Sequence, residues 1–94
     1  MPLRGVRGAI GAKANEQEAI YQATRDLIEA MMEANPSLNP DDLASVYFTV
    51  TNDLTAAVPA QAARTLKGWQ FVPFLCSTEI PVPNSLPRVI RVLL

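Results

Sequence analysis

The sequence contains no histidine and only one cysteine. Without histidine, the chain cannot use an imidazole general base, a Ser-His-Asp or Cys-His arrangement, or a histidine-bound metal. A single cysteine can neither close a disulfide within the chain nor build a zinc cluster. These absences exclude the commonest forms of nucleophilic and metal-assisted catalysis, and we expect no metal site.

An excess of positive charge and long apolar runs are also missing. Eight lysine and arginine residues stand against nine aspartate and glutamate residues, which gives a net charge of −1. A nucleic-acid-binding surface would normally require a basic excess. No stretch approaches the roughly 18 apolar residues of a membrane helix, and the N-terminus has no apolar run of signal-peptide length. We therefore expect a cytoplasmic protein with no nucleic-acid or membrane partner.

The chain does have the composition of an ordinary globular protein. It has 94 residues, of which 49% are hydrophobic and 18% are charged. This length accommodates one hydrophobic core, so residues 1–94 are expected to form a single domain.

The residue pattern predicts the element order β-α-β-α-β-β. Asn15 has the properties of a helix N-cap, and Gly68 those of a helix end. Pro73 requires an edge or a bulge in its strand. Strands are expected over 3–9, 44–51, 70–76 and 88–94, helices over 16–34 and 58–66, and a helical turn over 39–42. This predicts an α+β fold with a mixed sheet and helices on one face, whose other face is buried by a partner subunit.

Two arginines are unusual because they lie near the middle of predicted strands. Arg91 stands between Ile90 and Val92, and its own face carries apolar neighbours. An arginine in such a place must be paired or must reach a ligand, and an edge-strand charge is an equally valid interpretation. Arg7 poses the same question in the first strand. If the two converge, they form a site for a carboxylate, which guanidinium binds as a planar fork.

Four further side chains could belong to such a site, and each has a simpler interpretation. Glu79 could accept a hydrogen bond from a ligand hydroxyl or be a solvated loop acid. Cys76 has no base partner, so a small buried residue is favoured over a nucleophile. Arg64 could be a solvated helix charge, and Trp69 a core or interface anchor.

Taken together and in order, these segments resemble a known family, the monofunctional AroH class of chorismate mutase. The resemblance covers nearly the whole chain. It rests on Arg4-Gly5-Val6-Arg7-Gly8-Ala9, Asp53-Leu54, Val58-Pro59-Ala60 with Ala63-Arg64, Gly68-Trp69-Gln70 with Val72-Pro73, Cys76, Glu79, and Ile90-Arg91-Val92.

The resemblance implies a homotrimeric pseudo-barrel enzyme of aromatic amino-acid biosynthesis, in the shikimate pathway. It would rearrange chorismate to prephenate without a cofactor or a covalent intermediate, in sites between neighbouring subunits. By the same resemblance, Arg7 binds the substrate dianion, and Arg91 contacts a carboxylate and the ether oxygen of the breaking bond. Glu79 and Cys76 meet the ring hydroxyl. The remaining implied substrate-binding residues are Arg64, Val58, Ala60 and Leu75.

The chain departs from the family pattern at several positions. Gln61 stands where the family commonly has lysine, Val58 where it has phenylalanine, and Leu75 where it has threonine. The family chain also continues past this C-terminus, through a helix, a strand, a site tyrosine and an arginine-bearing end. We therefore expect a form that is short at its C-terminus.

Two alternatives to an active enzyme stay open. One is a catalytically impaired or non-catalytic trimeric module that binds a small carboxylate between subunits. The other is an interaction domain in which Arg7 and Arg91 merely pair with Glu79. An enzyme requires these three residues to line one cleft, whereas the interaction domain requires direct contact with no cavity.

Overall fold

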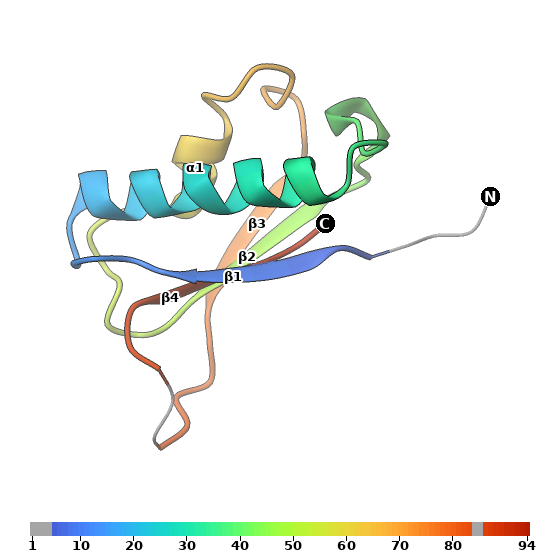
Figure 1. The fold of residues 1–94 in the computed structure, drawn as a ribbon. Coiled ribbons are helices and arrows are strands. Elements are labelled where there is room, and N and C mark those ends of the chain that lie inside the picture. Colours follow the sequence, from blue (N-terminus) through green and yellow to red (C-terminus); the bar gives the residue numbers. More distant parts are fainter. Residues whose placement is uncertain (1–4, 84–85) are drawn as a thin grey trace.

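The computed structural model describes residues 5–83 and 86–94, which form a sheet covered by helices (Figure 1). The strands are β1 (Arg7–Gly11), β2 (Val46–Val50), β3 (Phe74–Thr78) and β4 (Val89–Leu93). They make one four-stranded sheet in the order β1-β4-β2-β3. The last strand of the sequence therefore lies inside the sheet.

The sheet is mixed, as predicted. Strand β4 is antiparallel to both β1 and β2, whereas β2 and β3 are parallel. A parallel pair needs a crossover connection, and helix α2 (Pro59–Ala63) lies on that connection.

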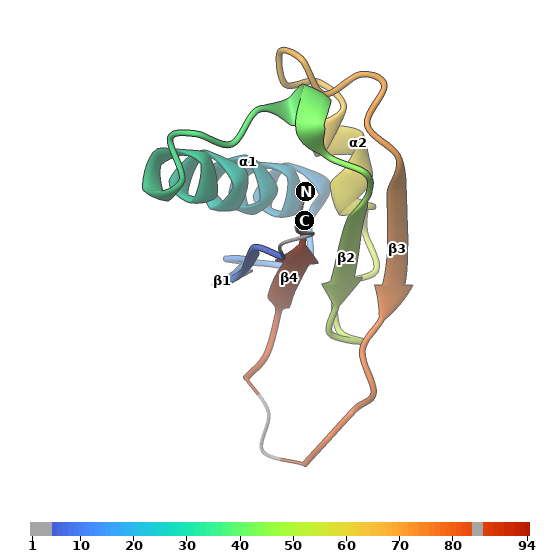
Figure 2. The same ribbon diagram turned by 90° about the vertical axis from the view of Figure 1, so that its right-hand side faces the viewer.

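The helices cover one face of the sheet (Figure 2). Helix α1 (Gln17–Ala34) packs over β1, and α2 packs beside it near β3. A short 3-10 turn, Pro40–Asp42, follows α1. The predicted α+β fold with helices on one face is thus confirmed. In the part of the chain that the structure describes, no helix has the length and apolar character needed to span a membrane.

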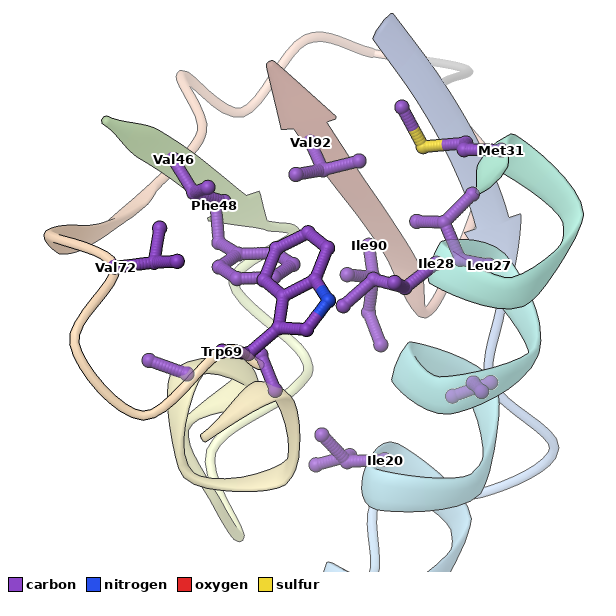
Figure 3. Close-up of a cluster of buried hydrophobic side chains, with 14 of the residues drawn as sticks. Ile20, Leu27, Ile28, Met31, Val46, Phe48, Trp69, Val72, Ile90 and Val92 are labelled. Atoms are coloured by element: carbon purple, nitrogen blue, oxygen red, sulfur yellow. The ribbon is translucent and has the colours of Figure 1, made fainter. Parts of the chain in front are cut away.

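The core lies between the helices and the sheet (Figure 3). The apolar side chains of α1 recur at the helical spacing and face the sheet, as the sequence predicts. Phe48 of β2 is fully buried at the centre, and Trp69 stacks against Phe74 beside it. Trp69 is therefore a core anchor. The buried side chains labelled in Figure 3 are Ile20, Leu27, Ile28, Met31, Val46, Phe48, Trp69, Val72, Ile90 and Val92.

Strand β1 approaches α1 closely at a glycine. A Cβ atom built on Gly8 would lie 2.8 Å from Met31 Sδ and 3.0 Å from Leu27 Cδ1. The absence of a side chain at this position lets the strand and the helix pack together.

All four predicted strands have different bounds in the structure, and two of them begin four residues later than predicted. The first strand begins at Arg7, not at residue 3, and residues 3 and 4 lie outside the described residues. The third strand spans Phe74–Thr78 instead of 70–76. Pro73 has no N–H to contribute to a ladder, and it precedes the strand while its carbonyl accepts a hydrogen bond from Val46 N–H at 2.8 Å.

The helix ends agree only in part with prediction. The second helix covers Pro59–Ala63 rather than 58–66 and its C-cap is Arg64, so Gly68 does not end this helix. Gly68 does have a positive φ of 87°, which favours glycine. The N-cap of α1 is Glu16, not Asn15. Asn15 instead accepts hydrogen bonds from the N–H groups of Thr55 and Ala56 at 2.8 and 3.0 Å. A long-range contact thus takes the oxygen that local capping would use.

Candidate functional site

The uncovered face of the sheet brings the two strand arginines together. Arg91 of β4 lies opposite Ala9 of β1 and Thr49 of β2, while Arg7 lies opposite Leu93. Alternate residues of a strand share a face, so Arg7 and Arg91 both belong to the face that the helices leave open. Strand β4 is internal, which excludes the edge-strand interpretation of Arg91.

Both arginines line a cavity of about 610 Å³ on this open face. This volume lies within the range of small-molecule sites. The lining is Arg7, Gly8, Ala9, Tyr47, Thr49, Arg91, Val92 and Leu93. In the described ranges, 5–83 and 86–94, Arg7 has no hydrogen-bond or ion-pair partner. Its guanidinium group is therefore available to an anionic ligand.

Glu79 lies directly beside Arg91 at the end of β3. Arg91 Nε is 2.8 Å from Glu79 Oε1, and the Thr49 hydroxyl donates to the same oxygen at 2.8 Å. The Glu79 side chain is 21% exposed and that of Arg91 is 54% exposed. The pair thus lies at the protein–water boundary, where an ion pair contributes modestly to stability but orients both groups.

The site satisfies the predicted cleft geometry for the two arginines but not for all three groups. Arg7 and Arg91 share the cavity, and Arg91 also touches Glu79 directly. Glu79 lines a separate cavity of about 190 Å³ on the loop side. The interaction-domain interpretation requires that the arginines touch Glu79 and leave no cavity. The structure contains the contact between Arg91 and Glu79 and also a cavity lined by both arginines.

A second group of predicted residues lies elsewhere, between α2 and β3. Cys76 is opposite the buried Phe48 and so points toward the helices, away from Arg91. Arg64 Cζ lies 5.2 Å from the centroid of the Phe74 ring, as in a cation–π contact. Ala60 is buried on α2, and Val58 is the exposed N-cap residue of that helix.

The environment of Cys76 suits a structural thiol. Burial raises the pKa of Cys76 above its ordinary value, and this effect exceeds the opposing ones of the Ala60 backbone and the Arg64 charge. A raised pKa leaves little thiolate at neutral pH, which does not favour nucleophilic catalysis. Leu75, by contrast, points to the open face and is 61% exposed.

The structure adds residues that the sequence did not indicate. Thr49 holds the carboxylate of Glu79, and the Tyr47 hydroxyl lies 2.6 Å from Ser77 Oγ on the same face. Strand alternation assigns Thr49 to the face of Tyr47, but only the alignment of β2 with β4 places it beside Arg91. The available signal was the pair of hydroxyl side chains, Tyr47 and Thr49, at alternate positions of an otherwise apolar strand.

The fold is that of one protein class, and the comparisons with known proteins identify this class. The family described as chorismate mutase type I matches residues 3–94, and the chain belongs to this family. The chorismate mutase AroH of Thermus thermophilus is 56% identical over 91 residues, which cover 97% of this chain and 74% of the relative.

Two further relatives support the assignment. The chorismate mutase AroH of Bacillus subtilis (strain 168) is 39% identical over 94 residues, 100% of this chain and 73% of the relative. A solved chorismate mutase from Clostridium thermocellum superimposes with a TM-score of 0.90 and 43% identity, covering 97% of this chain and 80% of that one. The predicted family and enzyme class, an isomerase, are confirmed.

Proposed function

We propose that this chain rearranges chorismate to prephenate and that Arg7, Arg91 and Glu79 carry the reaction. The observation that supports this most directly is the cavity of about 610 Å³ that both arginines line. The substrate is a dianion, and two guanidinium groups on one face are suited to it because each can bind a carboxylate through a planar fork.

The two arginines would act differently. Arg7 is free to bind a carboxylate because it has no partner among residues 5–83 and 86–94. Arg91 uses Nε for Glu79, which leaves its terminal N–H groups for the ligand. These groups would contact a carboxylate and the ether oxygen, where negative charge develops as the bond breaks.

Catalysis of this kind needs neither a nucleophile nor a proton transfer. In the rearrangement, the carbon–oxygen ether bond breaks as a carbon–carbon bond forms within the same molecule. The site would hold the compact conformer in which the reacting ends meet and would place positive charge at the ether oxygen. Glu79, fixed by Thr49, would accept a hydrogen bond from the ring hydroxyl.

We also propose that each complete site forms between two chains of a homotrimer. Arg64 and Cys76 lie on the helix side of the sheet, whereas Arg7 and Arg91 lie on its open side. One chain alone therefore cannot bring the two groups around one ligand. Tyr47, Leu75 and Leu93 are exposed on the open face, as expected for a surface that a second chain covers.

Residues 1–94 would act as a single domain in the cytoplasm.

The direct test measures loss of chorismate absorbance with the purified chain, with Arg91→Ala and with the control Arg25→Ala. Arg25 lies on α1, where it contacts Gln22, so its loss should leave the rate unchanged. Loss of the Arg91 charge should lower kcat by at least about 100-fold. An unmodified chain without turnover would refute the activity, and equal rates for Arg91→Ala would refute the role of Arg91. Sedimentation that gives a folded monomer would refute the shared site.

A non-catalytic binding module is the second candidate, and the Arg91–Glu79 contact is the observation that favours it. The carboxylate already occupies one side of the guanidinium group. Calorimetric titration with prephenate, combined with the chorismate assay, separates the two functions. Both candidates would bind prephenate, but only the enzyme would also convert chorismate, so binding without turnover would indicate the module.

A further inference from the structure

Strand β4 is entered through a residue in an unusual conformation. Arg88 has φ of 51°, in the left-handed region that residues other than glycine rarely adopt. It is the one non-glycine residue with positive φ among those that the structure describes. Such a conformation persists only where the surrounding contacts hold it.

Asp53, in the loop after β2, provides one set of these contacts. Arg88 N–H donates to both carboxylate oxygens of Asp53, at 2.9 and 3.1 Å. The Thr51 hydroxyl donates to Asp53 Oδ1 at 2.5 Å and accepts from Val89 N–H at 3.0 Å. Two successive backbone N–H groups at the start of β4 are therefore bound by side chains from one short loop.

The end of β1 provides the second set. Ala12 N–H donates to Arg88 O at 2.7 Å, and Arg88 Nε donates back to Ala12 O at 3.1 Å. Arg88 is thus fixed between the strands that flank β4. The sequence before it includes Pro81, Pro83 and Pro87, which lack the N–H groups that could otherwise set the register.

This arrangement determines which face Arg91 occupies. Arg91 follows Arg88 by three residues, and a slip of one residue at the start of β4 would turn every side chain of the strand to the opposite face. Arg91 would then leave both Glu79 and the cavity. We propose that Asp53 is a positioning residue for Arg91: its carboxylate holds Arg88 in the left-handed conformation and so fixes the register of β4.

The effect of Asp53 on catalysis rests on the proposed function, but its effect on the position of Arg91 does not. The position of Arg91 is therefore tested first, by a measurement that needs no enzyme activity. The Nε–H signal of Arg91 in a nitrogen-15 arginine spectrum reports the contact with Glu79. In Asp53→Ala, we expect hydrogen exchange at this group to accelerate by at least about tenfold, as expected when a charge-assisted hydrogen bond is lost. Unchanged exchange would overturn the proposal, even if the chain proved inactive.

Replacing Arg88 supplies the matched control. Glycine adopts positive φ without restraint, whereas alanine does not, and both remove the contact of Arg88 Nε with Ala12. Asp53→Ala with Arg88→Gly should therefore recover most of the slow exchange, while Asp53→Ala with Arg88→Ala should not. Equal behaviour of these two double variants would refute the role of the left-handed conformation.

Kinetics then separate positioning from general destabilisation. Asp53→Ala should lower kcat by about 100-fold, the order expected when a catalytic group is displaced, and the Arg88→Gly background should restore it. Asp41→Ala, which removes an exposed carboxylate of the 3-10 turn, should change neither rate nor exchange. If Asp53→Ala does not fold, Asp53→Asn retains one acceptor oxygen and should show a smaller loss. A kcat unaffected in both Asp53 variants would contradict the proposal.

Discussion

Adding one methyl group at Gly8 tests how closely β1 and α1 are packed. In Gly8→Ala, the new Cβ atom would meet Met31 Sδ at 2.8 Å and Leu27 Cδ1 at 3.0 Å. Both distances are shorter than van der Waals contact, so the side chains or the strand must move. Overpacking of this kind costs about 1–3 kcal/mol.

A second glycine of the same strand provides the control. The Cβ atom in Gly11→Ala would lie 3.9 Å from Arg88 O, which is an ordinary contact. A glycine-to-alanine change that fits the native backbone stabilises by about 0.4–1 kcal/mol, because it restricts the unfolded chain. Gly8→Ala restricts the unfolded chain in the same way, so this gain cancels when the two variants are compared. Their stabilities should therefore differ by the overpacking cost alone, about 1–3 kcal/mol.

Urea unfolding at one fixed protein concentration measures this difference. The Gly8→Ala midpoint should be the lower of the two, and its melting temperature should fall by about 4–8 °C for each kcal/mol lost. Combining Gly8→Ala with Met31→Ala opens space for the methyl group, so the two losses should be less than additive. If Gly8→Ala is as stable as Gly11→Ala, the close packing of β1 on α1 is wrong.

Three other predictions concern the core and two titrating groups. Phe48→Ala should lower the free energy of unfolding by about 3–5 kcal/mol in a urea titration, because Phe48 is fully buried; a smaller change than that of an exposed control, Phe71→Ala, would contradict this. The pKa of Asp53 is lowered mainly by the Thr51 hydroxyl and then by Arg88 N–H. Its contribution to stability should be present above the unfolded value of 3.8 and be lost as pH falls through the lower folded pKa; acid unfolding of Asp53→Asn should lack that component. Alkylation of Cys76 by iodoacetamide should show its pH inflection above 9.0, because burial raises the pKa, and an inflection near neutrality would exclude a structural thiol.

The periodicity of apolar residues predicts correctly those helices and strands that pack against the core through one face. The apolar spacing from Ile20 to Met31 indicates α1, and the β-branched residues around Phe48 indicate β2. Strand β3 was misplaced because its aromatic and apolar pattern begins before Pro73, and the missing N–H of that residue delays pairing until Phe74. Periodicity cannot reveal which hydrogen bonds a neighbouring strand will offer.

Some residues of the candidate site could be predicted from the sequence, and others could not. Arg7 and Arg91 could be predicted because guanidinium groups on apolar strands are rare, and the register confirms that they share a face. The roles proposed for Thr49 and Asp53 depend on contacts with residues 30 and 35 positions away. Such contacts follow from the strand order, which the sequence alone did not supply.

The bond between Arg91 and Glu79 also affects what a ligand must immobilise. Holding a long side chain in one rotamer at an interface typically costs about 0.5–1.5 kcal/mol in lost entropy. Folding has already met part of this cost for Arg91, whose Nε is fixed 2.8 Å from a carboxylate that Thr49 orients. Arg7 has no such restraint in the described part of the chain. The Arg91 side chain is therefore preorganised before the ligand binds, whereas the Arg7 side chain must be ordered by the ligand.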